Sequence, residues 1–205
     1  MRRLLRNIVS TVLAMRCSYY KAWGFQYRAM KIVLHICCGV CATAVVERLV
    51  SEGHQILGLF YNPNIYPLQE YNKRLEATRE VAKRMNLQLE APPYDPESWL
   101  QEIAGLESEP EGGRRCQVCF RHRLKRTYLY METYKLDAFT TTLTVSPHKS
   151  AAVINRIGQE IGGERFLAGD YKKKDGFRRA MELGKEFDLY RQHYCGCRYS
   201  MGKGE

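Results

Sequence analysis

The fold is decided by residues 31–53, KIVLHICCGVCATAVVERLVSEG. Lys31–Ile36 is short, apolar and rich in β-branched residues, which predicts a buried strand. A cysteine-rich turn follows, and apolar residues at helical spacing predict a helix over 42–51 that ends at Gly53. A buried strand that leads through a short turn into a helix is the unit from which parallel sheets are built.

The same alternation of strand and helix continues along the chain. We expect strands over 56–61, 87–90, 138–143 and 166–169, and helices over 68–85, from Pro96 onward, over 116–134, from Pro147 to about 161 and over 178–187. This order predicts an α/β fold in which a mostly parallel sheet carries helices on both faces. Ligands bind such sheets at the carboxyl ends of the strands, so the turn after Ile36 is the first candidate site.

Composition and charge limit the class of protein and suggest two parts. With 205 residues, 45% hydrophobic and 26% charged, the chain is not wholly disordered. It has no run of about 18 apolar residues, which excludes a membrane-spanning protein. Of the net charge of +10, residues 1–30 contribute +6 in the pattern of a basic amphipathic helix. We expect a basic, dispensable appendage over 1–30 and a single α/β catalytic domain over 31–205.

Seven of the eight cysteines fall into three clusters, which are Cys37, Cys38 and Cys41, then Cys116 and Cys119, then Cys195 and Cys197. Packing as small apolar residues explains one or two of them. A disulfide framework requires an oxidising compartment, and the sequence has no convincing signal peptide. Thiolates at short spacing select zinc or an iron–sulfur cluster. Adjacent cysteines, and more thiols than one tetrahedral site needs, favour iron–sulfur but leave zinc open.

The two cysteine pairs predict different chemistry. Cys116 and Cys119 are expected at the start of a helix among arginines, where the helix dipole and the guanidinium groups lower thiol pKa values and stabilise an anionic cluster. A disulfide between Cys195 and Cys197 closes a small ring that is easily reduced, which suits a reversible two-electron relay. Two further metal ligands, or an inert pair near a frayed terminus, are the alternatives for these two cysteines.

Basic residues gather beside the cysteines and after the last expected strand. Basic patches of this kind suit a polyanion such as tRNA that is bound mainly through its phosphates, and a solvated basic face is the ordinary alternative. The candidate tRNA-binding residues are Arg114, Arg115, Arg121, Arg123, Lys172, Lys173, Lys174, Arg178 and Arg198.

Two further side chains lie near the expected site. Asp170 follows the last expected strand and is the best-placed carboxylate for a second metal or a proton-transfer role, with a turn cap as the equal alternative. His35 lies on the first strand, where a packed core histidine is the more common role than a metal ligand.

Taken in order, these motifs resemble the QueH-type epoxyqueuosine reductases over about residues 31–199. The resemblance is carried by His35-x-Cys37-Cys38-x-x-Cys41, Cys116-x-x-Cys119, Lys172-Lys173-Lys174-x-Gly176-Phe177 and Cys195-x-Cys197. It implies a Rossmann-like, nucleotide-binding α-hydrolase-like fold. It also implies a cytoplasmic oxidoreductase that reduces epoxyqueuosine to queuosine at the wobble position of tRNA, with an unidentified electron donor.

The resemblance also implies roles for the cysteines. A 4Fe-4S cluster would be held by Cys37, Cys38, Cys116 and Cys119, with Cys41 as an alternative ligand, and Cys195 and Cys197 would form the redox-active pair. An additional iron ion near Asp170 is a further expectation, with iron as the Lewis acid on the epoxide oxygen. The alternative function is a zinc-stabilised RNA-binding module without redox chemistry.

Overall fold

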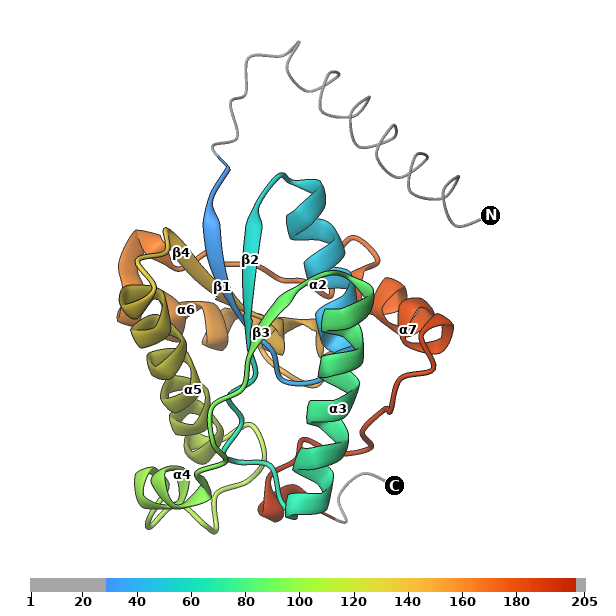
Figure 1. Cartoon of the computed structure of the whole chain (residues 1–205). Helices are drawn as coiled ribbons and strands as arrows, with labels where there is room; N and C mark the ends of the chain where they lie inside the picture. The colour runs from blue at the N-terminus through green and yellow to red at the C-terminus, as the bar shows by residue number, and fades with distance from the viewer. Residues whose placement is uncertain (1–28, 202–205) are drawn as a thin grey trace.

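The computed structural model of the chain describes residues 29–201 (Figure 1). Its strands are β1 (Lys31–His35), β2 (Gln55–Leu59), β3 (Gln88–Glu90) and β4 (Ala138–Thr141). Its α-helices are α2 (Gly39–Ser51), α3 (Leu68–Arg84), α4 (Pro96–Glu102), α5 (Arg114–Thr133), α6 (Ala151–Gly162) and α7 (Gly176–Glu186). Short 3-10 turns cover Thr142–Val145, Gly163–Arg165 and Arg198–Ser200.

The four strands form one parallel sheet in the order β3-β2-β1-β4. In register, Val33 of β1 lies opposite Leu57 of β2 and Phe139 of β4. Every strand therefore ends at the same edge of the sheet. The expected α/β fold with a parallel sheet and helices on both faces is confirmed.

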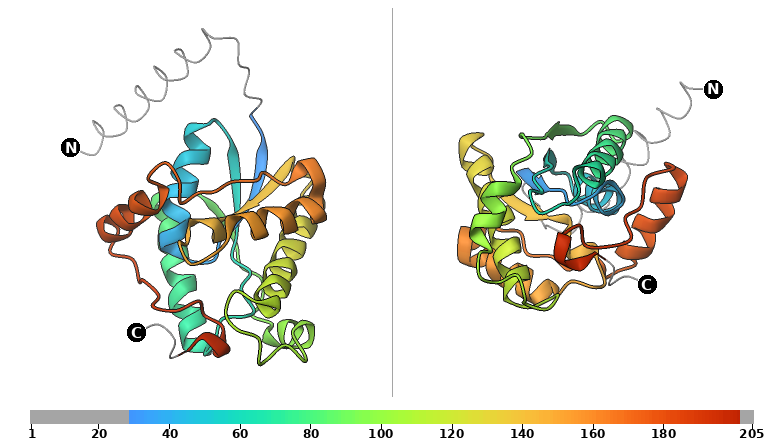
Figure 2. Two further views of the ribbon diagram at one scale, coloured as in Figure 1. Left: turned by 180° about the vertical axis from the view of Figure 1, so that it is seen from behind. Right: turned by 90° about the horizontal axis from the view of Figure 1, so that it is seen from below.

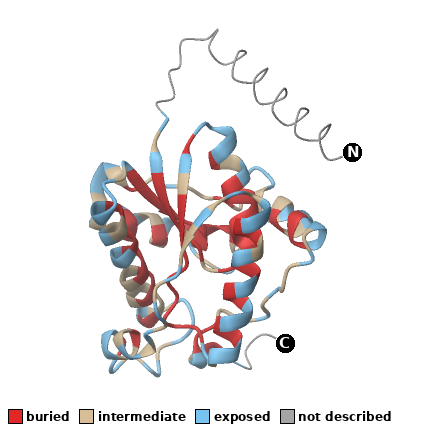
Figure 3. Ribbon diagram, in the orientation of Figure 1, coloured by how far each residue is buried: buried red, intermediate tan, exposed pale blue. Residues whose placement is uncertain are grey.

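Two helical layers cover the sheet. Helices α2, α3 and α7 pack on one face and α5 and α6 on the other (Figures 1 and 2). Strand β1 supplies both cores in alternation, because Ile32 and Leu34 belong to the first and Val33 to the second. All three residues are fully buried, and the centre of the sheet is buried throughout (Figure 3). This explains why the β1 stretch is almost continuously apolar.

Two of the expected elements are displaced or largely missing in the structure. Pro147 does not open a helix, because α6 begins at Ala151, where the Ser150 hydroxyl caps it by accepting a hydrogen bond from the Val153 amide (3.4 Å). The expected strand over 166–169 is reduced to one parallel bridge between Phe166 and Phe139. Both corrections leave loops rather than regular structure at the carboxyl edge of the sheet.

The expected basic amphipathic helix of the appendage lies outside the described residues, and the division at residue 30 stays a prediction. Between residues 29 and 201, no helix has both the length and the apolar character that crossing a bilayer requires.

His35 ends β1 as a neutral, fully buried imidazole. Its Nε2 lies 3.2 Å from the carbonyl oxygen of Tyr61, which only accepts, so Nε2 carries the proton. Its Nδ1 lies 2.9 Å from the hydroxyl of Thr141, which in turn accepts a hydrogen bond from the Leu143 amide. Burial, followed by the charge of Arg123, lowers the pKa of His35 to about 4. These contacts agree with its expected role as a packed core histidine.

Stability should therefore fall as the pH drops from 6.5 towards 4. In this window the unfolded chain binds a proton at His35 that the folded chain does not, and the shift corresponds to about 3 kcal/mol of unfolding free energy. Urea unfolding at pH 7, 5.5 and 4.5 measures this loss. The His35→Gln variant is expected to be less stable at pH 7 but to lose less stability over the same window. An equal loss in both proteins would contradict the assignment.

Candidate functional site

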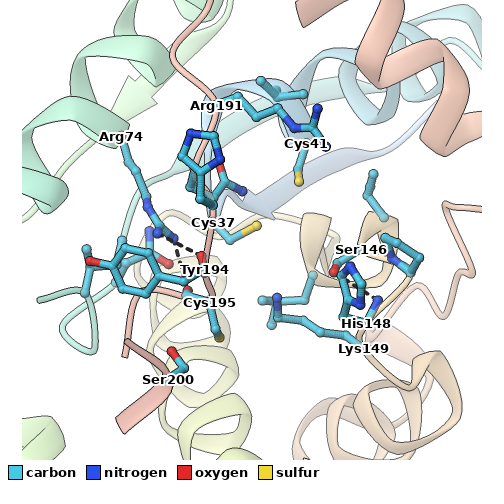
Figure 4. A pocket seen from close by; sticks show the side chains of 18 of the residues that line it. Cys37, Cys41, Arg74, Ser146, His148, Lys149, Arg191, Tyr194, Cys195 and Ser200 are labelled. Carbon is cyan, nitrogen blue, oxygen red and sulfur yellow. Dashed lines mark hydrogen bonds between the residues drawn. The ribbon is translucent and has the colours of Figure 1, made fainter. Parts of the chain in front are cut away.

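A cavity of about 520 Å³ lies at the carboxyl ends of β1, β2 and β4 (Figure 4). It is bounded by the turn after β1, the loop after β2, the loop over 146–149 after β4 and the C-terminal segment over 191–195. The chain reaches this last segment after α7, where it returns past the sheet towards the start of α3 (Figure 1). A volume in this range is typical of small-molecule sites.

Three thiols gather in the turn after β1. Cys38 is the N-cap of α2, and its sulfur accepts a hydrogen bond from the backbone amide of Cys41 (3.4 Å). The Sγ atoms of Cys37 and Cys38 are 3.9 Å apart, and the three Sγ atoms all lie within 4.8 Å of one another. Helix α2 begins three residues earlier than expected, and this early start brings Cys41 beside Cys38 in its first turn.

Of these three thiols, Cys37 loses its proton most readily. Hydrogen bonds from the thiols of Cys38 and Cys41 hold the pKa of Cys37 well below its usual range. Its sulfur also accepts a hydrogen bond from the Thr142 hydroxyl (3.3 Å). The pKa of Cys38 is raised to about 12 by its hydrogen bond to Cys37, and that of Cys41 is raised for the same reason. These hydrogen bonds favour the thiolate form of Cys37, which is the form of cysteine that binds a metal.

The other four described cysteines lie on the α4 and α5 side of the cavity. Cys195 lines the cavity together with Cys37 and Cys41 (Figure 4). Cys119 and Cys197 are buried in a small core with Trp99. None of the seven described cysteines is joined in a disulfide. The assignment of four cysteines as cluster ligands and the pairing of Cys195 with Cys197 stay predictions.

The expected lowering of the thiol pKa values on α5 is wrong. Cys116 lies in the first turn of α5, and its sulfur accepts a hydrogen bond from the Gly112 amide (3.2 Å). Burial nevertheless raises the pKa values of Cys116 and Cys119. Desolvation of these thiols outweighs the helix terminus and the nearby guanidinium groups.

Two cations lie beside the thiols, of which Arg123 is buried and Lys149 half-buried. Arg123 is 2% exposed and lines the cavity. Burial acts to lower its pKa, but the thiols of Cys119 and Cys195, followed by that of Cys37, raise it. Lys149 lines the other part of the cavity, and its pKa is likewise raised, against burial, by Cys195 and Cys37. The cavity is therefore built to hold negative charge on sulfur.

Arg115 and Arg123 do not belong to an exposed basic surface, so their assignment to tRNA phosphates is wrong. Each is 2% exposed. Arg115 donates hydrogen bonds to the carbonyl oxygens of Leu106 and Glu107 (3.3 and 2.8 Å) and thereby fixes the loop before α5. Helix α5 turns the face that carries Arg115, Cys119 and Arg123 inward.

The remaining seven basic candidates are at least partly accessible. Arg114, Lys173, Lys174, Arg178 and Arg198 are exposed, and Arg121 and Lys172 are half-buried. Arg121 forms an ion pair with Glu160. Their contact with tRNA stays a prediction.

Asp170 does not line the cavity. Its carboxylate lies 2.7 Å from Nζ of Lys172 and 3.9 Å from Nζ of Lys173. These contacts describe an ion pair within the loop before α7. A metal or proton-transfer role for Asp170 stays a prediction.

Sequence reasoning missed several polar residues of the cavity. They are Asn62, Asn64, Arg74, Lys149 and Gln192. The two asparagines follow β2, so the rule that placed the cysteines at a strand end also applies to them. Gln192 donates to Sγ of Cys38 (3.0 Å), a contact across 154 positions that no local pattern indicates.

A buried ion pair fixes the segment that carries Cys195. Arg74 pairs with Glu70 one helical turn away (2.7 Å), and both side chains are nearly inaccessible. The same guanidinium donates to the carbonyl oxygens of Tyr194 and Cys195, each at 3.0 Å (Figure 4). Glu70 also accepts the Tyr190 hydroxyl (2.6 Å). Helix α3 therefore holds Cys195 at the cavity.

Comparison with known proteins identifies the family. The family model described as epoxyqueuosine reductase QueH matches residues 32–203. The chain belongs to the QueH epoxyqueuosine reductase family. A QueH relative from Streptococcus pyogenes serotype M1 is 38% identical over 190 residues, which are 88% of this chain and 74% of that protein. A QueH relative from Thermotoga maritima is 32% identical and covers 83% of this chain and 90% of its own.

A solved structure supports the fold of this QueH-family chain. The NMN synthetase from Francisella tularensis superposes with a TM-score of 0.53 at 18% identity, over 86% of this chain and 70% of that one. At this identity the likeness concerns the fold alone. It agrees with the expected α/β fold.

Removal of the Arg74 charge should loosen this QueH-family site and destabilise the fold. Arg74→Met leaves the buried Glu70 carboxylate unpaired, which costs about 3–5 kcal/mol of unfolding free energy. Urea unfolding measures this loss, and hydrogen exchange should become faster over residues 190–197. The matched control is Arg79→Met, which breaks an exposed pair with Glu76 and should change stability by less than about 1 kcal/mol. Equal effects of the two variants would contradict the clamp.

Proposed function

We propose that this chain reduces epoxyqueuosine to queuosine in tRNA at the cavity beside Cys37, with an iron–sulfur cluster and the Cys195/Cys197 dithiol. The activity itself follows from the family, because its members are epoxyqueuosine reductases and the chain is an oxidoreductase of that family. The assignment to this cavity rests on the residues that line it. A group of three thiols, the thiol of Cys195, and the cations Arg123 and Lys149 surround one space of about 520 Å³.

The residues present fit a bound cluster. The trio of Cys37, Cys38 and Cys41 offers thiol ligands within 4.8 Å of one another. Within the described part of the chain, Nη2 of Arg123 is buried without a hydrogen-bond partner, as expected where an anionic group binds. We assign a 4Fe-4S cluster to Cys37, Cys38, Cys116 and Cys119, with Cys41 as the alternative ligand. When bound, the cluster supplies electron transfer and an iron that acts as a Lewis acid.

The dithiol has one accessible and one buried partner. Cys195 faces the cavity, whereas Cys197 is 8% exposed and burial raises its pKa to about 11. Burial therefore favours the protonated form of Cys197 before turnover. Oxidation of the pair to a disulfide releases two electrons and two protons. The epoxide takes up the two electrons and the two protons. Its two carbon–oxygen bonds break, and the products are an alkene and one water molecule.

Partners follow from this reaction. The substrate nucleoside is part of tRNA, and the exposed basic residues Arg114, Lys173, Lys174, Arg178 and Arg198 are the proposed contacts to its phosphates. An external electron donor must reduce the Cys195/Cys197 disulfide after each turnover. We assign the chain to the cytoplasm, where thiols are kept reduced. We also propose that an additional iron ion binds near Asp170.

Serine variants separate the cluster ligands from the dithiol. Cys38→Ser and Cys119→Ser should lose most of the iron and sulfide of the anaerobically purified protein. Cys195→Ser and Cys197→Ser should keep both but convert less than about 1% of epoxyqueuosine in tRNA, because the two-electron donor is gone. Iron, sulfide and zinc analysis and mass spectrometry of tRNA nucleosides measure these outcomes. A colourless wild-type protein with stoichiometric zinc would instead favour a zinc-stabilised RNA-binding module.

The charge of Arg123 should tune the bound cluster. A buried cation stabilises the reduced, more negative state, so Arg123→Gln should make the reduction potential of the cluster more negative. Arg123→Lys should restore part of the difference. A redox titration followed by electron paramagnetic resonance measures the potential. Arg121→Gln, on the same helix but paired with Glu160 and half-buried, is the control and should leave the potential unchanged. Equal potentials in all four proteins would place the cluster away from Arg123.

A further inference from the structure

Asn64 has the features of a side chain that recognises a ligand. It is 2% exposed and lines the cavity. Within the described residues, neither Oδ1 nor Nδ2 of its amide has a hydrogen-bond partner. A buried amide without partners is rare and destabilises a folded protein unless a ligand or water completes its hydrogen bonds. Both amide atoms of Asn64 thus lack a partner within the protein, at the wall of the cavity.

Asn62, in the same loop after β2, is an asparagine with a structural role. It lies two positions away, is 1% exposed and lines the same cavity. Its Nδ2 donates to the carbonyl oxygen of Ile36 (2.8 Å), and its Oδ1 accepts from Nη1 of Arg123 (3.4 Å). The protein therefore uses both amide atoms of Asn62 to join β1, β2 and α5. The unused amide of Asn64 is specific to that residue and not a property of the loop.

The surroundings of Asn64 place it next to the dithiol segment. Two residues later, the Tyr66 amide donates to the carbonyl oxygen of Gly196 (2.7 Å), between Cys195 and Cys197. The carbonyl oxygen of Ile65 accepts the hydroxyl of Tyr94 (2.6 Å), which holds the loop from the other side. The amide of Asn64 is therefore held in a fixed loop beside the proposed redox pair. Preorganised polar groups of this kind provide specificity at low entropic cost.

We infer that Asn64 is a specificity-determining residue whose amide binds a neighbouring donor and acceptor on the modified nucleoside. A primary amide presents one acceptor beside one donor, which matches either the two neighbouring hydroxyls of the ring or the amide edge of the guanine-like base. Both belong to the nucleoside that the cavity admits. The inference rests on the proposed function, because the nucleoside is the substrate assigned there. It adds a residue that reads the substrate without taking part in electron transfer.

The test combines stability and binding in the anaerobically purified full-length protein. Asn64→Leu has nearly the same volume and removes both amide atoms. Its melting temperature without RNA should equal or exceed that of the wild type, because an unpartnered polar group is lost. Its Kd for an anticodon stem-loop with queuosine at the wobble position should rise about tenfold or more. Asn62→Leu is the matched control and should lower the melting temperature.

A second stem-loop, with guanosine at the wobble position, identifies the group that is read. Weaker binding of the queuosine stem-loop alone assigns Asn64 to the ring hydroxyls, and weaker binding of both assigns it to the base edge. An unchanged Kd for both overturns the inference. A melting temperature that falls as far as in Asn62→Leu also overturns it, because it shows a structural role. Turnover of an epoxyqueuosine stem-loop by wild type is measured separately, so that failure of the reductase assignment is distinguished from failure of the inference.

Discussion

A guanidinium charge buried next to thiols is the constraint on which the site depends. Arg123 is 2% exposed, and among residues 29–201 no carboxylate forms an ion pair with it. Its hydrogen bonds go to neutral acceptors, the Cys119 carbonyl (3.3 Å) and Asn62 Oδ1 (3.4 Å). Removal of such a charge from water costs several kcal/mol. The negative sulfur of Cys37, or a cluster on these thiols, supplies the compensating charge. Burial of the Arg123 charge in the fold therefore depends on negative charge at the neighbouring thiols.

The same dependence explains why distant parts of the chain must meet. Cys37 lies in the turn after β1, and the two cores fix the position of this strand. Cys195 comes from a segment with no helix or strand of its own, and this segment needs an external support. The Glu70–Arg74 pair on α3 provides that support through two backbone carbonyls. The turn after β1 is thus fixed by the two cores, whereas the segment that carries Cys195 is held by side-chain contacts from α3. This arrangement suits a dithiol that an external donor must reach.

Local patterns predicted the fold and the thiol groups because both depend on residues that are close together in the sequence. The apolar run of β1 and the close spacing of Cys37 and Cys38 need no tertiary information. The burial of Arg115 and Arg123 could have been seen, since they share one helix face with Cys119 at intervals of four, but the charge suggested a solvent-exposed face. The contacts of Arg74 with the carbonyl oxygens of the C-terminal segment, and of Gln192 with Cys38, could not be predicted, because each spans more than a hundred positions. Pro147 misled the helix assignment because the capping residue of α6 is Ser150.

The division of the cations between interior and surface has a consequence for RNA recognition. Arg115 and Arg123 serve the interior, Arg121 is paired with Glu160, and Arg178 lies 3.0 Å from Asp175. Fewer free charges remain for phosphates than the sequence suggests, and residues 31–205 carry a net charge of only +4. Phosphate contacts position an RNA but do not distinguish one nucleoside from another. Selection of the modified nucleoside must therefore come from neutral polar groups inside the cavity, which is the property that Asn64 offers.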